Sequence, residues 1–186
     1  MPRTVVVYHS GYGHTQRIAH AVAEGADATL LAIDAEGNLP QGGWELLASV
    51  DAIVFGSPTY MGNVSWQFKK FADASSKVWF AQGWKDKLAA GFTASAGMSG
   101  DKQGVLTSLF TLAMQHSMLW VSQGLMPANT KAAKRNDVNY IVSYSGLMAQ
   151  TPSDASADDC LPGDLETARL FGARIAQMAQ RLAPQA

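Results

Sequence analysis

Residues 4–15 read Thr4-Val5-Val6-Val7-Tyr8-His9-Ser10-Gly11-Tyr12-Gly13-His14-Thr15, and this stretch decides the fold. Its first part, residues 4–8, is an apolar β-branched run without polar alternation, which is typical of a strand covered on both faces in a parallel sheet. The part after residue 8 is rich in Gly and Ser. Apolar residues then recur at helical spacing as far as Gly25, where we expect the helix to end. The stretch therefore predicts a buried strand, a tight loop and a helix, in that order.

The same cycle continues along the chain. Further buried strands are predicted at residues 29–33, 52–55, 88–92 and 118–121. Helices are predicted at 44–49, around 64–71, at 105–114 and at 162–182. This alternation is typical of βαβ units around a parallel sheet, and 186 residues suffice for one sizeable core. We therefore expect a single α/β domain over residues 1–186.

The segment between Ser122 and Gly163 breaks this pattern. It holds one short possible strand at residues 140–142 and a small, polar, acidic stretch at residues 151–159. Long irregular segments in compact domains are usually functional or lie at an interface. We expect this one to be a lid or a subunit contact.

Composition excludes several classes of partner. Lys and Arg number 14 against 15 Asp and Glu, so no strong field attracts nucleic acid or anionic lipid, and no apolar run is long enough to insert into a membrane. The single Cys160 cannot form an internal disulfide, and nothing before Val5 resembles a secretion signal, so we expect a cytoplasmic protein with an inert surface thiol at Cys160. The four histidines show no metal-ligand spacing, and no metal site is expected.

The loop at residues 10–15 is the first candidate site, because open parallel sheets bind ligands at the carboxyl ends of their strands. Its hydroxyls, its glycines and the amino end of the following helix suit a phosphate group. A purely steric Gly-rich turn is the simpler alternative. A dinucleotide-binding loop is another alternative, because Asp34 ends the second predicted strand, where that motif has an acidic residue. Gln16, however, occupies the position where the motif needs a small residue. A P-loop is excluded because no Lys follows the glycines.

Two more loops are expected at the same edge of the sheet. Residues 56–63 read Gly56-Ser57-Pro58-Thr59-Tyr60-Met61-Gly62-Asn63, which could lie against a flat heterocycle and hydrogen-bond its polar edge. The alternative is a turn whose Tyr60 merely covers the core. Residues 93–100 are small and flexible, as a backbone that approaches a ligand closely must be.

Together these segments resemble the FMN loops of the flavodoxin-like NAD(P)H:quinone oxidoreductases related to the tryptophan-repressor-binding protein. The likeness spans nearly the whole chain, including Trp79 and the run from Thr111 to Met118. It implies a doubly wound three-layer α/β sandwich, with a five-stranded parallel sheet in the order 2-1-3-4-5 and helices on both faces. It also implies that FMN is held by Ser10, Gly11, Tyr12, Gly13, His14, Thr15, Pro58, Thr59, Tyr60, Met61, Gly62, Asn63, Ser95, Ala96 and Gly97.

The resemblance further implies an enzyme that passes two electrons from NADPH or NADH to a quinone at one site, in ping-pong order. His116 would lie near the flavin and orient the quinone or donate a proton, although a histidine that is only hydrogen-bonded in place explains it as simply. Tyr60-Met61 stand where relatives often carry Arg-Phe, which removes a cation near the flavin.

The alternatives to this enzyme are a non-enzymatic electron carrier and a regulatory protein. Carriers usually have a strongly acidic face, which a net charge of −1 does not suggest, and no DNA-reading helix is apparent. A homodimer or homotetramer is expected from the aromatic cluster of Trp79, Phe80 and Trp84.

Overall fold

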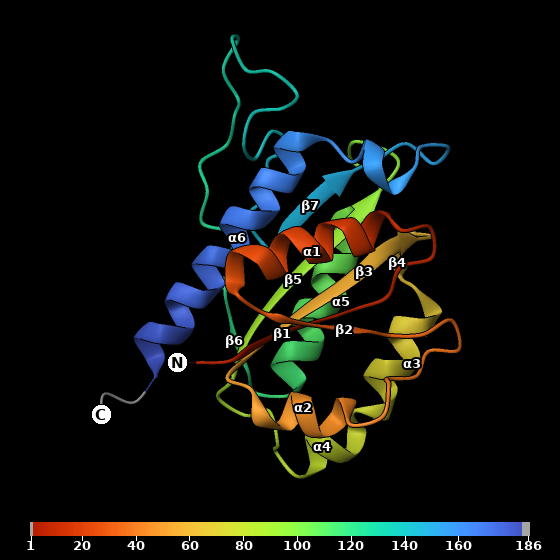
Figure 1. Cartoon of the computed structure of the whole chain (residues 1–186), viewed down its shortest axis with the longest axis vertical. Coiled ribbons are helices and arrows are strands. Elements are labelled where there is room, and N and C mark those ends of the chain that lie inside the picture. Colours follow the sequence, from red (N-terminus) through yellow and green to blue (C-terminus); the bar gives the residue numbers. More distant parts are fainter. Residues whose placement is uncertain (1, 184–186) are drawn as a thin grey trace.

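The computed structural model describes residues 2–183 and contains one parallel sheet with helices on both faces (Figure 1). The sheet follows the order β2-β1-β3-β5-β6. Its strands are β1 (Thr4–Tyr8), β2 (Thr29–Ala32), β3 (Ala52–Tyr60), β5 (Leu88–Ser95) and β6 (Leu119–Trp120). The predicted strand order 2-1-3-4-5 is confirmed, because β4 (Asn63–Val64) is a hairpin partner of β3 outside this path.

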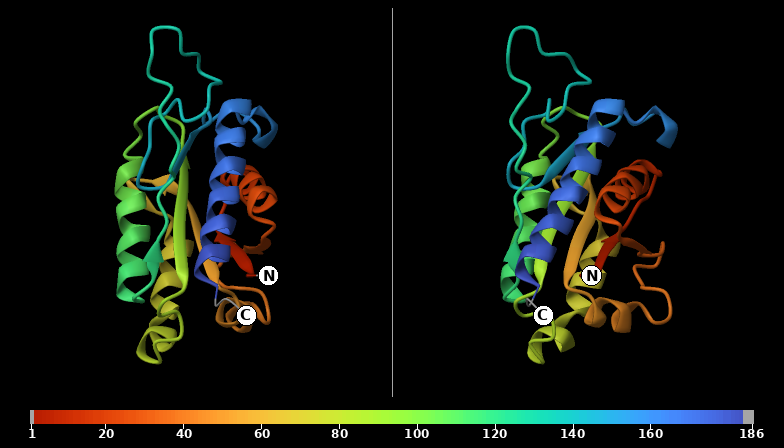
Figure 2. Two further views of the ribbon diagram at one scale, coloured as in Figure 1. Left: turned by 90° about the vertical axis from the view of Figure 1, so that its left-hand side faces the viewer. Right: turned by 60° about the vertical axis from the view of Figure 1, so that its left-hand side comes forward.

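The helices form two layers (Figure 2). One face of the sheet is covered by α1 (His14–Ala26) and α6 (Pro162–Leu182). The other face is covered by α2 (Gly43–Ser49), α3 (Trp66–Ala74) and α5 (Lys102–Gln115). A short helix that the sequence pattern did not predict, α4 (Ser76–Phe80), follows α3, and a 3-10 turn, η1 (Ala157–Asp159), precedes α6. None of the helices among residues 2–183 is both long and apolar enough to cross a bilayer.

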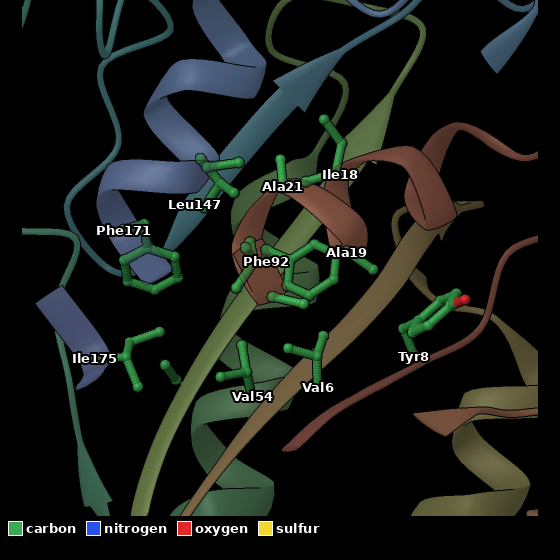
Figure 3. Packing of buried hydrophobic residues seen from close by; sticks show 14 of the residues in the cluster. Val6, Tyr8, Ile18, Ala19, Ala21, Val54, Phe92, Leu147, Phe171 and Ile175 are labelled. Carbon is green, nitrogen blue, oxygen red and sulfur yellow. The ribbon is translucent and has the colours of Figure 1, made fainter. Parts of the chain in front are cut away.

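Alternate residues of the strands feed two separate cores, as the continuous apolar runs predict. Val6 and Val54 point toward α1 and α6, whereas Val5 and Ile53 point toward α3 and α5. Phe92 of β5 lies in the first core with Phe171 of α6 (Figure 3). The central strands β1, β3 and β5 are therefore buried on both faces and offer ligands only their ends.

The two helices on the first face approach each other closely at glycines. A Cβ at Gly25 would overlap the carbonyl of Arg169, and a Cβ at Gly172 would overlap the carbonyl of Val22. α1 ends at Ala26, one residue beyond the end predicted at Gly25. The role of Gly25 is to let α6 pack against the backbone of α1.

The fifth position of the sheet is shared by two short strands. β6 pairs with the beginning of β5 at Leu88, and β7 (Leu147–Gln150) pairs with its end, from Phe92 to Ser95. The segment 121–146 between them rises beyond the carboxyl end of the sheet (Figure 1). The short strand predicted at residues 140–142 is absent: these residues form turns, and the strand begins at Leu147 instead.

Candidate functional site

A cavity of about 270 Å³ opens at the carboxyl ends of β1, β3 and β5. Its lining comes from the loop after β1, the end of β3, the end of β5 and the segment before α6. The lining residues are Tyr12, His14, Thr15, Pro58, Thr59, Tyr60, Ala94, Ser95, Ala96, Thr151 and Ser153. Within the described part of the chain, no carboxylate and no Lys or Arg lines this cavity. The wall is therefore built of hydroxyls, aromatic rings and backbone.

The first loop is folded around its own hydroxyl. The Gly13 N–H donates to Ser10 Oγ (3.1 Å), and Gly13 itself has a φ of 90°, which favours glycine. This turn starts α1 at His14, so the helix's amino end and the buried Thr15 hydroxyl lie at the cavity. Amino ends of helices favour anions because their first N–H groups lack helical partners.

The second loop is a strand extension and a tight hairpin rather than an irregular turn. Tyr60 pairs with Asn63, and Met61 and Gly62 between them have φ values of 48° and 77°. Positive φ at both central residues is the mark of the type I′ hairpin. Ser108 of α5 donates to Asn63 Oδ1 (2.9 Å), which fixes the hairpin against α5. Met61, Gly62 and Asn63 therefore form a tip beside the cavity and do not line it.

Two tyrosines connect this hairpin to the first loop. The rings of Tyr12 and Tyr60 meet edge to face, with centroids 6.2 Å apart. A Cβ at Gly11 would overlap the Tyr60 phenol, so a larger residue there would displace the Tyr60 ring. Burial, with a smaller effect from Tyr12, raises the pKa of the Tyr60 phenol, which keeps it protonated near neutral pH.

The third loop is held from behind through its oxygens. Lys102 Nζ donates to Ser95 Oγ (2.8 Å) and to the Gly97 carbonyl (2.6 Å), and Gln150 Nε2 donates to the Ala96 carbonyl (2.8 Å). Among residues 2–183, the N–H groups of Ala96 and Gly97 find no acceptor. The loop therefore keeps free donors beside the cavity, while its acceptors are occupied.

Behind Gln150 lies an ion pair that links the segment 121–146 to α6. Arg135 makes two contacts of 2.7 Å with the Asp164 carboxylate, which also accepts from the Gln150 N–H (2.8 Å). Sequence reasoning missed Lys102, Arg135, Gln150 and Asp164. The one usable signal is Lys102, because a cation at the first residue of a helix opposes the helix dipole.

The segment before α6 covers the first loop. His14 Nε2 lies 2.8 Å from the Ala155 carbonyl, and Thr151 and Ser153 line the cavity. Cys160 follows in the same segment and is buried beside Thr151 Oγ1 (3.3 Å), so the expectation of a surface thiol is wrong. Burial raises the pKa of the Cys160 thiol, which is consistent with an inert group.

The structure does not bring His116 to the cavity. It follows α5 and precedes β6, whose Leu119 pairs with Leu88 at the start of β5. The cavity is at Ser95, roughly 23 Å further along that strand. His116 is buried, and its Nε2 lies 2.8 Å from Ser75 Oγ, with its ring packed on Trp84 at a centroid distance of 4.3 Å. The simpler interpretation, a histidine hydrogen-bonded in place, fits this geometry.

Comparison with known proteins agrees with this geometry. Residues 44–133 match the family model described as NADPH-dependent FMN reductase. The chain is 54% identical to Flavodoxin FldP of Pseudomonas aeruginosa (strain UCBPP-PA14), covering 98% of this chain and 99% of that protein.

Solved structures give the same result. The flavodoxin, WrbA-like protein from Agrobacterium tumefaciens is 55% identical with a TM-score of 0.81, over 97% of this chain and 99% of that one. Oxidised Flavodoxin 1 from Bacillus cereus, at 19% identity and a TM-score of 0.61 over 94% and 97% of the two chains, shares the fold. This chain therefore belongs to the flavodoxin family, among its WrbA-like members.

Proposed function

We propose that this protein is an FMN-dependent oxidoreductase that transfers two electrons from NADPH or NADH to a quinone in ping-pong order. The observation that carries the proposal is the cavity where three loops meet at the carboxyl ends of β1, β3 and β5. Its lining of hydroxyls, aromatic rings and free N–H groups suits a phosphorylated, flat, acceptor-rich ligand. The family match over residues 44–133 supports FMN as that ligand.

The residues present fit FMN at both of its ends. The turn at Gly13, the Thr15 hydroxyl and the amino end of α1 would hold the phosphate without a fixed cation. The free N–H groups of Ala96 and Gly97 would donate to carbonyl oxygens of the ring, and Tyr60 would pack against its plane. Ser10 would act by shaping the loop, because its oxygen is already bonded to the Gly13 N–H.

When bound, FMN would supply the redox chemistry by accepting a hydride from NAD(P)H and later giving two electrons and a proton to the quinone, which takes its second proton from solvent. The protein's residues orient and shield this chemistry. The segment that carries Thr151 and Ser153 limits water on one side of the cavity, and Pro58 and Tyr60 limit it on another. The remaining open side is where a nicotinamide or quinone ring would stack.

An apolar rim supports an uncharged acceptor. Tyr12 is 76% exposed at the cavity, and Met61 is fully exposed at the adjacent hairpin tip. Both can pack against a flat quinone, and neither brings a charge. We place the quinone against this rim and assign no catalytic role to His116.

A steady-state assay tests the proposal. Protein reconstituted with FMN is mixed with NADPH or NADH and benzoquinone, and nucleotide oxidation is followed at a series of fixed quinone concentrations. We expect FMN-dependent turnover with parallel double-reciprocal lines, the signature of a ping-pong order. FMN binding without turnover would contradict the enzyme and favour a carrier.

A non-enzymatic electron carrier is the second candidate, because the curated relative at 54% identity is named a flavodoxin. The net charge of −1 gives such a carrier little long-range attraction to a redox partner.

Self-association as a dimer or tetramer in the cytoplasm also remains our proposal. Trp79 and Phe80 of α4 are exposed, while Trp84 belongs to the core, and sedimentation velocity would measure the number of subunits.

A further inference from the structure

Lys102 is a buried cation that the proposed function does not use. It is the first residue of α5, and its side chain has no exposed surface. Its Nζ reaches two members of the third loop, Ser95 and Gly97. Burial lowers the pKa of this ammonium to about 8, although Asp164 acts in the opposite direction.

This position is unfavourable for a lysine on two counts. The amino end of a helix carries a partial positive charge, which repels a cation. A buried ammonium also loses its hydration, and two loop oxygens replace that only in part. Costly groups of this kind concentrate at functional sites.

We propose that Lys102 is a positioning residue of the cofactor site, holding Ser95 and Gly97 in place and putting one positive charge directly behind the cavity wall. The inference rests on the proposed function. By occupying the oxygens of the loop, Lys102 leaves its N–H groups free for the ligand. Its charge favours the reduced flavin, which carries a negative charge on its ring at neutral pH, over the neutral oxidised ring.

The neighbouring charges leave Lys102 as the effective cation. Asp164 of α6 faces it but is already held by both amino groups of Arg135, which comes from the segment 121–146. Asp101, which precedes Lys102, is exposed to solvent. The pair of Arg135 and Asp164 is close to neutral as a unit, so the field at the loop depends on the charge state of Lys102.

Three variants test this role. Lys102→Met removes the charge, and Lys102→Arg keeps it. Lys87→Met is the matched control, because Lys87 also donates to main-chain carbonyls, those of Ala48 and Val50, but at the opposite end of β5. The measurements are FMN affinity by fluorescence quenching from pH 7 to 9.5, the two-electron midpoint potential, and the melting temperature of the FMN-free protein.

We expect Lys102→Met to bind oxidised FMN roughly tenfold more weakly at pH 7, because the loop loses the charged hydrogen bonds that Lys102 makes to Ser95 and Gly97. Reduced FMN should lose roughly a further tenfold, which lowers the potential by about 30 mV. Wild-type affinity should fall above pH 8 toward that of Lys102→Met, because Lys102 then loses its proton. Lys102→Arg should restore binding at pH 7 and abolish this pH dependence.

The stability of the wild-type fold should change with pH in the direction opposite to its FMN affinity. The folded protein holds Lys102 with a pKa of about 8, below the ordinary 10.5, so the unfolded chain binds the proton more tightly. Wild-type stability should therefore rise between those two pH values. Lys102→Met should not melt below wild type at pH 7, and any advantage should shrink across that window.

Wild-type affinity and potential in Lys102→Met would overturn the inference, as would a loss that is uniform with pH and shared by Lys87→Met. If Lys102→Met does not fold, Lys102→Arg provides the test. An FMN affinity that falls above pH 8 in Lys102→Arg as it does in the wild type would overturn the proposed role of Lys102. Failure of the wild type to bind FMN would overturn the proposed function itself, and the inference with it.

Discussion

The two ends of the sheet are built differently. At the amino end, several polar groups are tied to partners: Asp51 accepts from the Arg3 N–H (2.7 Å), Lys87 Nζ donates to the Ala48 carbonyl (2.7 Å), and His116 Nε2 bonds Ser75 Oγ, although His116 Nδ1 finds no partner among the described residues. At the carboxyl end, the N–H groups of Ala96 and Gly97 are free and Lys102 is buried against the helix dipole. The polar groups at the amino end mainly stabilise the fold. Those at the carboxyl end have a free-energy cost that binding of a ligand can offset.

This difference teaches that the same residue type serves different purposes at the two ends. Lys87 and Lys102 flank one strand, β5, and each donates to backbone carbonyls. Lys102 stands behind the wall of the cavity at the carboxyl ends of the strands, whereas Lys87 lines a separate hollow at their amino ends. Substitutions at the carboxyl end should therefore change FMN binding more than stability, and substitutions at the amino end the reverse.

The largest expected effect on FMN binding is at the phosphate loop. Changing Ser10 to Ala and Thr15 to Val together should weaken FMN binding by about 2 to 4.5 kcal/mol, because the Thr15 contact with the charged phosphate contributes about 1.5 to 3 kcal/mol and the Ser10 hydrogen bond that shapes the loop about 0.5 to 1.5 kcal/mol. FMN titration of the purified variant measures this. Ser49→Ala, which removes a hydroxyl at the amino end, is the control. FMN affinity within twofold of wild type in the double variant would contradict the phosphate assignment.

The next effect should appear at the amino end. Trp84 is buried against Phe55, Phe71 and His116, with ring centroids 4.3 to 6.3 Å away. Trp84→Ala should lower the free energy of unfolding by about 3 to 5 kcal/mol. Urea denaturation measures that loss. FMN affinity of the folded fraction should stay at the wild-type value, and a tenfold drop would show that the two ends are coupled.

The elements were largely predictable from the sequence because each strand is a continuous apolar run and each long helix has a periodic face. The periodic helix ending near Leu182 and the strand at residues 4–8 are examples. β7 was missed because Leu147–Gln150 alternates between buried and half-buried residues and follows an irregular segment. Its pairing with the end of β5 is set by tertiary packing, which local pattern does not report.

The site was predictable to the extent that its residues lie in consecutive loops. Thr15, Pro58 and Ser95 reach one cavity because parallel strands end at one edge. Gln150 and Arg135 act on that cavity from segments without a pattern, so nothing local could find them. His116 shows the opposite outcome. The resemblance implies a place near the flavin, but the structure puts His116 at the carboxyl end of α5, far from the cavity.

The smallest effect compares two residues in the left-handed region, Met61 at the carboxyl end and Asp27 after α1 at the amino end, each with a φ of 48°. That conformation costs a non-glycine residue about 1 to 2 kcal/mol, and glycine's extra freedom when unfolded costs about 0.5 to 1 kcal/mol. Met61→Gly should therefore stabilise the fold by about 0.5 to 1 kcal/mol in urea denaturation, and Asp27→Gly by less, because the short Asp side chain tolerates this conformation better. Only Met61→Gly should also raise the KM for benzoquinone, because it alone removes an apolar side chain from the rim of the cavity. If both variants gain stability and neither changes KM, the strain at Met61 serves the hairpin alone, and the acceptor must be placed elsewhere on the open side of the site.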